Sequence, residues 1–405
     1  MPDLSEIPNL ERTNFFNCTN LVLVPSSIQN FNNLSMLCFR GCESLRSFPR
    51  DIHFVSPVTI DFSFCVNLTE FPKISGKITE LNLCDTAIEE VPSSVECLTN
   101  LKELYLSRCS RLNRLSTSIC KLKSLHELIL SDCLSLESFP EILEKMEHLK
   151  YLSLYNTAIT ELPSSFANLE GLEKLVLVGC SKLNKLPHSI GNLKSLVHFL
   201  ASGSALSQLP ASVADLNEFK LTSFSRCRGL SSLVDIDLSN CAVVEILEDV
   251  CCLSSLQWLD LSGNNFESLP SSIKQLSQLR KLDLSNCNML LSLPELPLFL
   301  EDLEARNCKR LQFLPEIPSC LEELDASMLE KPPKTSHVDE FWTEEMLSIK
   351  FKFTNCLKLN EKAYNKILAD SKLTIQRMAI ASLRLFDEKV CNPLSFSSLS
   401  LFITS

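Results

Sequence analysis

The chain has 405 residues, 45% of them apolar and 21% charged, and its formal net charge is −11. This composition supplies enough apolar side chains for a large core. The acidic balance, without any Lys/Arg-rich stripe, argues against nucleic-acid binding, which requires clustered cations to neutralise phosphates. No stretch of 18 apolar residues and no basic-then-apolar leader occurs, so we expect no membrane partner and place the chain in the cytoplasm, or also in the nucleus.

A phrase recurs from Leu10 to Met328, every 21 to 24 residues except for one interval of 14 residues. Its clearest copy is LHELILSDCLSLESFPEILEKMEH, residues 125–148. If the first apolar residue is called offset 0, apolar residues also stand at offsets 3 and 5, Cys stands at offset 8, and a second half of the form LxxLPxSIxxL follows. The copies begin at Leu10, Leu34, Pro57, Ile78, Leu101, Leu125, Leu149, Leu172, Leu196, Phe219, Leu233, Leu256, Leu279, Leu300 and Leu321. These fourteen or fifteen copies have the pattern and period of the leucine-rich repeat.

The first half of each repeat predicts a short β-strand. In LxxLxL the alternate leucines point into the core, while the residues at offsets 2 and 4 face outward. Stacked copies would form a parallel sheet, and the LPxSI half would return the chain along the other side, where Pro fixes the bend and the apolar residue three positions later fills the core. We therefore predict an α/β leucine-rich-repeat solenoid, a horseshoe with a parallel β-sheet on its concave face, followed by a small partial α+β region.

Ten of the nineteen cysteines stand at offset 8. The column reads Cys18, Cys42, Cys65, Thr86, Cys109, Cys133, Thr157, Cys180, Ser204, Cys227, Cys241, Asn264, Cys287 and Cys308. Backbone carbonyls lose their ladder partners where the chain turns off the sheet, so we expect these small donors to bond them inside the core. This role accounts for the cysteines without oxidation, and the absence of a CxxC pair gives no support to a metal site.

Two further features narrow the type of repeat. The second halves read LPSSI at 269–273, LPHSI at 186–190 and VPSSV at 91–95, unlike the LxGxIP of extracellular plant repeats, and the compact late repeats carry PELP at 294–297 and PEIP at 315–318. Together with Cys in the ladder, these features resemble the repeat region of plant nucleotide-binding leucine-rich-repeat immune receptors, in particular the class with a Toll/interleukin-1-receptor-like signalling domain. The segment FKFTNCLKLN, from Phe351, is similar to the start of the post-repeat domain of that class.

The resemblance implies a module that binds proteins. Full-length members hold a nucleotide-binding module closed through the repeats until a pathogen protein binds. The partners implied are therefore a pathogen effector or a guarded host protein, and the nucleotide-binding module of a related receptor. The chain has no GxxxxGK[ST], HExxH or GxSxG motif, so we expect no cofactor, no metal and no enzymatic activity, and we interpret it as a fragment without the signalling and nucleotide-binding domains. The alternative is a stand-alone intracellular signalling scaffold of the same repeat type.

The outward offsets of the middle repeats carry an apolar and aromatic stripe. Such a stripe on a sheet surface indicates protein binding, although packing between neighbouring strands would favour the same residue types. Its members are Tyr105, Ile129, Tyr151, Tyr155, Val176 and His198, with Val178 and Leu200 beside them.

The same offsets in the late repeats are mostly acidic. They read Asp235, Asp237, Trp258, Asp260, Lys281, Asp283, Asp302, Glu304, Glu323 and Asp325. Like charges on neighbouring strands oppose folding, so this face predicts a basic partner, for which the nucleotide-binding module is a candidate; the alternative is a solvated face that aids solubility. Trp258 is the candidate anchor within it.

The domain boundaries follow from the repeats. We predict the solenoid over 1–328, a linker over 329–350, and a truncated post-repeat domain with an unrelated tail over 351–405. One repeat is short, because SFSRC and DLSNC end only 14 residues apart, at Cys227 and Cys241. A parallel crossover ordinarily requires a dozen or more residues, so the shortened repeat at 219–232 predicts a break between the apolar stripe and the acidic face.

Overall fold

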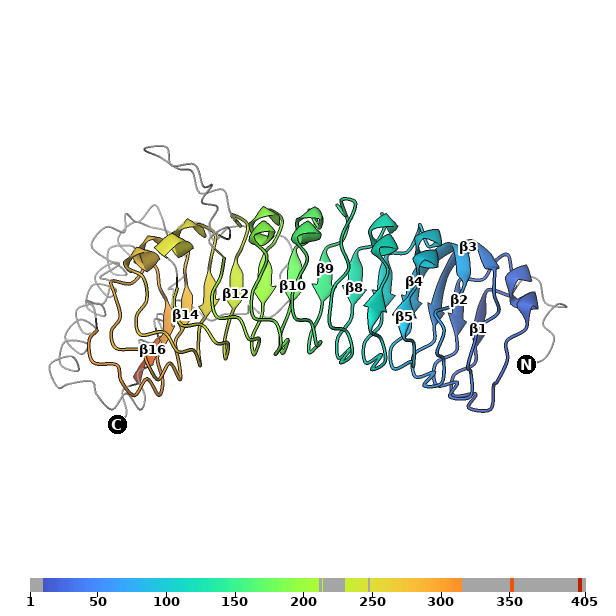
Figure 1. Ribbon diagram of the computed structural model, residues 1–405, viewed down its shortest axis with the longest axis horizontal. Helices are drawn as coiled ribbons and strands as arrows, with labels where there is room; N and C mark the ends of the chain where they lie inside the picture. The colour runs from blue at the N-terminus through green and yellow to red at the C-terminus, as the bar shows by residue number, and fades with distance from the viewer. Residues whose placement is uncertain are drawn as a thin grey trace, which may run out of the picture. The chain divides into compact units, whose positions relative to one another are not determined.

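The computed structural model describes residues 10–210, 213, 230–246 and 248–314, together with two short strands at 350–352 and 400–402. The chain divides into two compact units, Met1–Leu233 and Val234–Ser405. Within each unit, short strands follow one another in chain order across a sheet (Figure 1). This architecture confirms the predicted leucine-rich-repeat solenoid. Its helices, in the residues described, are all 3-10 helices.

All the strand pairs described below are parallel, and each described repeat contributes one strand to the main sheet of its unit. The main sheet of the first unit contains β1 (Arg12–Asn14), β2 (Met36–Cys38), β3 (Ile52–Asp61), β4 (Ile74–Asn82), β6 (Glu103–Tyr105), β8 (Glu127–Ile129), β9 (Tyr151–Ser153), β10 (Lys174–Val176) and β11 (His198–Leu200). A small second sheet pairs β5 (Glu90–Val91) with β7 (Arg114–Leu115). The second unit contains β12 (Asp235–Asp237), β13 (Trp258–Asp260), β14 (Lys281–Asp283), β15 (Asp302–Glu304), β16 (Lys350–Lys352) and β17 (Ser400–Phe402).

Burial explains why these residues form strands. The central residue of each three-residue strand up to β15 is buried, as Leu104 and Leu128 show with 0% and 1% exposure. The leucine at offset 5, such as Leu106, is buried as well. Because successive side chains of a strand alternate in direction, offsets 2 and 4 face the opposite side. We call that side of the sheet the open face.

3-10 helices form the second half of many repeats. They are η1 (Ser26–Asn30), η2 (Ser93–Cys97), η3 (Thr117–Lys121), η4 (Ser164–Asn168), η5 (His188–Asn192), η7 (Glu248–Cys252) and η8 (Ser271–Gln275). An extended proline precedes several of them; Pro163, for example, accepts a hydrogen bond from the backbone of Phe166, whose side chain is fully buried. The predicted roles of the proline and of the apolar residue after it are therefore confirmed.

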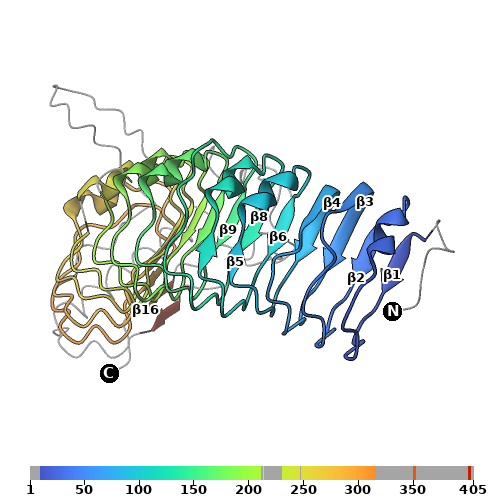
Figure 2. The same ribbon diagram turned by 45° about the vertical axis from the view of Figure 1, so that its right-hand side comes forward.

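Two repeats depart from this plan. β3 and β4 have ten and nine residues, because the second halves IHFVSP and ISGK lack the LPxSI phrase and continue as paired strands (Figure 2). Gly76 lies in β4 with φ 95°, and a Cβ atom there would collide with the backbone carbonyl of Phe54. The close approach of the two strands therefore requires glycine at this position.

The predicted ladder at offset 8 is confirmed. Each of seven thiols donates to the offset-5 carbonyl of the preceding repeat. Cys42, Cys65, Cys109, Cys133, Cys180, Cys287 and Cys308 bond Phe15, Phe39, Leu83, Leu106, Leu154, Leu261 and Leu284 at 3.0–3.3 Å. Burial raises the pKa of Cys65 to about 12 and that of Cys109 to about 11, so these thiols stay protonated donors at neutral pH. The described cysteines of this column are free thiols, whereas Cys252, which lies outside the column, is disulfide-bonded.

A second column, at offset 7, was not predicted. Its residues adopt positive φ in both units. They are Asn17, Gly41, Phe64, Asp85, Arg108, Asp132, Asn156, Gly179, Gly203, Asn240, Gly263, Asn286 and Asn307. From Asn17 to Gly179 and from Asn240 to Asn286, the backbone N–H groups of this column donate to the offset-6 carbonyl of the next repeat, as from Asn156 to Val178 at 2.7 Å. The left-handed residue turns the chain off the sheet while keeping the repeats bonded to each other.

The predicted boundaries fall largely outside the described residues. The short repeat at 219–232 lies there up to residue 229, and so do the fifteenth repeat, the linker up to residue 349 and most of 351–405. β16, at the predicted start of the post-repeat domain, pairs with β15. No helix in the described residues is long and apolar enough to cross a membrane.

Candidate protein-interaction face

The predicted contact residues of the first unit lie on or directly after strands of the open face. Tyr105, Ile129, Tyr151 and His198 are half-buried, and Tyr155 is 43% exposed. Val176 differs from the expectation of an exposed stripe, because only 8% of it is accessible. Val176 is therefore not part of the accessible stripe, whereas the other five predicted residues are at least partly accessible.

Tyr105 on β6 is held by two glutamates. Its hydroxyl donates to Glu103 at 2.6 Å and lies 3.3 Å from the carboxylate of Glu127 on the adjacent strand β8. Burial raises the pKa of Tyr105, and the hydrogen bond to Glu103 and the charges of nearby glutamates raise it further. The phenol is thus a neutral donor that fixes both carboxylates beside its own ring.

Further along the open face, aromatic and basic side chains stack. The Lys174 ammonium lies 5.3 Å from the centre of the Tyr151 ring, and β10 pairs Lys174 with His198 on β11. A cation over an aromatic face contributes about 0.5–1 kcal/mol at exposed sites. The apolar stripe therefore has a basic border on this side.

The open face of the second unit contains Trp258 among acids, as predicted. Trp258 is 42% exposed, and the Lys281 ammonium of the next strand lies 5.1 Å from the centre of its ring. The predicted anchor Trp258 is therefore accessible, and its ring contacts a neighbouring cation.

The acids at offset 4 have a local role that was not predicted. The carboxylates of Asp237, Asp260 and Asp283 each accept a hydrogen bond from the backbone N–H two residues later, at 2.8–2.9 Å. These turns close the end of each strand. The repeated D-x-S spacing at 237–239, 260–262 and 283–285 was the available signal. Part of the acidic character of this face is thus explained by turn formation.

A second acidic row was missed, and it lies in the first unit. The strand register places Glu80, Glu103 and Glu127 side by side on β4, β6 and β8. Burial raises the pKa of Glu80, and the charges of Glu103 and Asp61 raise it further. The available signal was a run of acids at offset 2 in three consecutive repeats.

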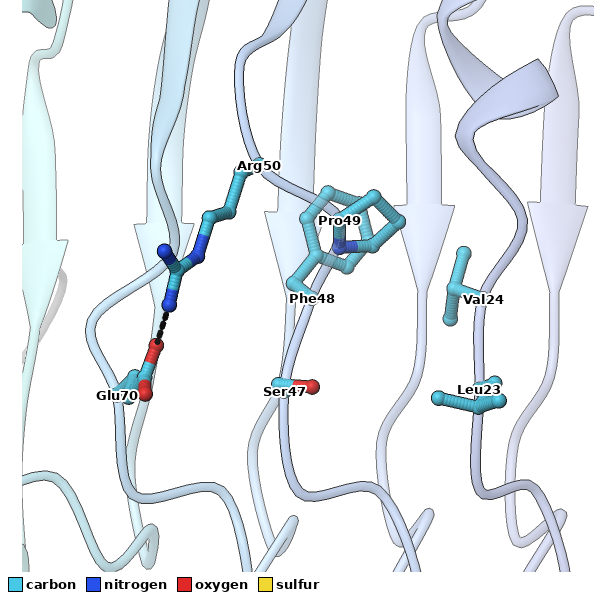
Figure 3. A pocket seen from close by; sticks show the side chains of 7 residues that line it. All are labelled: Leu23, Val24, Ser47, Phe48, Pro49, Arg50 and Glu70. Atoms are coloured by element: carbon cyan, nitrogen blue, oxygen red, sulfur yellow. Dashed lines mark ion pairs between the residues drawn. The ribbon is translucent and has the colours of Figure 1, made fainter.

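A shallow pocket of about 290 Å³ lies away from the open face. Figure 3 shows its lining side chains, which come from the second halves of the first three repeats. Arg50 and Glu70 meet at its rim with a 3.5 Å ion pair. In the described part of the chain, no group of three or more His, Cys, Asp or Glu side chains is placed to hold a metal ion.

Comparisons with known proteins agree with this architecture. The chain is 35% identical over 379 residues to Disease resistance-like protein DSC1 of Arabidopsis thaliana, covering 94% of this chain and 27% of that protein. It is 34% identical over 308 residues to TMV resistance protein N of Nicotiana glutinosa, covering 75% and 24% respectively. The chain thus spans about a quarter of the length of these two relatives.

The structural comparison supports the fold. A chain from the structure of the Toll–Spatzle complex of Drosophila matches with a TM-score of 0.56 and 19% identity, over 73% of this chain and 35% of that one. The family model "Disease resistance protein RPS4B-like, leucine-rich repeats" matches residues 121–330, just over half of the 405 residues. The chain belongs to the leucine-rich-repeat family of the RPS4B-like plant disease resistance proteins.

Proposed function

We propose that the chain is the protein-interaction module of a plant intracellular immune receptor and acts by binding alone, without catalysis. The observation that carries this proposal is the open face itself, where Tyr105, Ile129 and Tyr155 in the first unit and Trp258 in the second present apolar and aromatic surface from a rigid backbone. Exposed aromatic side chains on such a scaffold are typical anchors of protein interfaces.

Two kinds of partner follow from the family. The open face would hold the nucleotide-binding module of a related receptor inactive. A pathogen effector or a guarded host protein that binds the open face would then release that module. For the second unit we expect the basic surface of the nucleotide-binding module, because Asp235 and Asp302 flank Trp258 and Lys281 at offset 2. We place this activity in the cytoplasm, with the nucleus as a second compartment.

Co-precipitation of the full chain with a nucleotide-binding module from the same genome tests the proposal. Tyr155→Ala and Trp258→Ala should each reduce capture about tenfold or more, since buried aromatic anchors contribute about 2 kcal/mol or more. Leu143→Ala and Phe313→Ala are matched controls, because these side chains are 68% and 62% exposed but lie outside the strands. Equal capture by all four variants would contradict a role for the open face.

A further inference from the structure

The three glutamates at offset 2 of the first unit form an acidic strip, defined as Glu80, Glu103 and Glu127. They occupy equivalent positions on β4, β6 and β8, and neighbouring strands in a sheet lie about 4.7–4.9 Å apart. Figure 2 shows these three strands following one another, with β9 next in the row. Like charges directly opposite each other on adjacent strands destabilise a sheet.

The strip differs from other acids of the same unit. Neighbouring repeats there form ion pairs away from the open face, such as Lys121–Glu96, Lys123–Glu144 and Lys145–Glu170, at 2.7–2.8 Å. No ion pair within the described residues involves a member of the strip. Nor do its members accept from a turn as the offset-4 aspartates do. The strip is therefore a line of carboxylates whose charge the described part of the unit leaves uncompensated.

Beside the strip lies an apolar margin formed by Tyr105 and Ile129. Both are half-buried at offset 4, on the same strands as Glu103 and Glu127. The Tyr105 hydroxyl bonds Glu103 and lies next to Glu127, so it positions two carboxylates at the border between the acidic and apolar halves. A ligand that fits this part of the open face must be cationic on one side and apolar on the other.

We propose that the acidic strip and its apolar margin bind a cationic segment of a partner protein, one that places two or three Arg or Lys side chains over Glu80, Glu103 and Glu127 and an apolar side chain over Ile129. Arginine suits the site best, because its planar guanidinium bonds a carboxylate through two parallel N–H groups. Alternate side chains of an extended segment lie about 6.5–7 Å apart, which long basic side chains bridge to strands spaced at about 4.8 Å. This inference rests on the proposed function, since it specifies the chemistry of one protein partner.

Repulsion between the glutamates of the strip destabilises the free chain, whereas in the complex their charge attracts the basic segment. Replacing its glutamates by glutamine removes the repulsion and keeps the acceptor for Tyr105, so the free chain should be at least as stable. The same change removes the charge that a basic segment requires. A purely structural role for the glutamates would not combine retained stability with lost binding.

The test uses the full chain and a fluorescein-labelled peptide with Arg at alternate positions followed by Leu and Phe, measured by fluorescence anisotropy. A triple variant, E80Q with E103Q and E127Q, should bind the peptide at least tenfold more weakly than the unmodified chain, with an unfolding midpoint in urea that is equal or higher. The control triple, E89Q with E147Q and E161Q, changes the net charge equally at exposed sites of the same unit and should shift the Kd less than twofold. A peptide with Gln in place of Arg should not bind.

Three results would overturn the proposal: no binding of the Arg peptide at low salt, equal binding by the strip variant, or equal weakening by the control triple, which would mean unspecific attraction to an acidic protein. The outcome is separable from that of the proposed function. A partner captured through Tyr155 or Trp258 and unaffected by the strip variant would leave the interaction module standing and remove only this inference.

Discussion

The charge of Asp260 is disfavoured in the folded second unit. This residue lies on β13 between Asp237 and Asp283, and burial raises its pKa, with the charges of both neighbours raising it further against the hydrogen bond from Ser262. Because the folded state binds this proton more tightly than the unfolded chain, the free energy of unfolding falls as pH rises from the ordinary pKa through the raised one.

Asp260→Asn should therefore stabilise the protein at pH 7 by about 0.2–1 kcal/mol. Asparagine keeps the acceptor for the N–H of Ser262, as Asn82 does for Cys84 at 3.0 Å. Urea denaturation at pH 7 and near pH 3 measures the effect, and the gain should shrink at the lower pH, where Asp260 is protonated. Asp260→Ala, which lacks the acceptor, is the control and should be less stable than the asparagine variant. A destabilising Asp260→Asn at pH 7 would contradict the role given to charge.

Gly203 is the position at which the effect of positive φ on stability can be tested separately from steric collision. Its φ is 67°, and among the described residues a Cβ atom built there would meet nothing closer than 3.9 Å, so a substitution collides with none of them. Gly203→Ala should cost about 1–2 kcal/mol, the penalty of the left-handed conformation itself. Gly203→Asn should cost less, because asparagine tolerates this conformation and occupies the same column at Asn156 and Asn240. Equal urea midpoints for the two variants would show that conformation is not the cause.

At the scale of elements, the offset-8 ladder contains two kinds of member. The thiol of Cys133 donates to one carbonyl, that of Leu106. The Asn264 amide donates to Leu238 and Leu261, each at 2.8 Å, and accepts from the backbone of Val243 at 3.1 Å. Asn264 therefore connects its own repeat to the strand end and to the loop of the preceding repeat, whereas Cys133 makes one link.

Asn264→Ala should cost about 2–5 kcal/mol, because it leaves buried backbone groups without partners. Cys133→Ala should cost about 1–2 kcal/mol, since Leu106 retains a bond from the backbone of Cys109 and only a small cavity is added. Urea denaturation of both variants, at one temperature and pH, gives the comparison. If Cys133→Ala proved the more damaging, packing of the thiol would outweigh hydrogen bonding in the ladder.

The sequence predicted elements where the local pattern decides the structure. The spacing of apolar residues sufficed for the strands and for the proline-led bends, because burial of every second side chain is a property of the segment itself. The long strands β3 and β4 were not predicted, since IHFVSP and ISGK simply lack the repeat phrase. The offset-7 column was not predicted, because Phe64 and Arg108 interrupt its preference for glycine and asparagine.

The candidate face was predictable in position but not in accessibility. Offsets 2 and 4 were correctly placed on one side of the sheet, yet how much of Val176 its neighbours cover depends on three strands at once. The acidic strip could have been predicted from the acids at offset 2 of three consecutive repeats, and the strand register shows that Glu80, Glu103 and Glu127 lie opposite each other. The turn role of Asp260 could have been predicted from the repeated D-x-S spacing, and the hydrogen bond from the backbone of Ser262 shows it directly.

Because the repeats are stacked, we expect a destabilising substitution to weaken mainly its own repeat and the adjacent repeats. Each repeat of a solenoid contacts only its neighbours, so its stability is close to a sum of repeat and nearest-neighbour interface free energies. Leu128, at the centre of β8 and 1% exposed, lies in the core of the first unit on a strand that pairs with β6 and β9. Leu128→Ala should cost about 2–5 kcal/mol through the cavity that it leaves.

Hydrogen exchange shows where that loss appears. In Leu128→Ala, amide protection should fall most in β6, β8 and β9 and progressively less toward β1 and β11, because each interface transmits only part of the loss. Leu143→Ala in the same repeat, where the side chain is 68% exposed, should change protection little. An equal loss of protection from β1 to β11 would instead show that the first unit unfolds as one cooperative block, since the cavity at Leu128 would then open distant repeats as readily as adjacent ones.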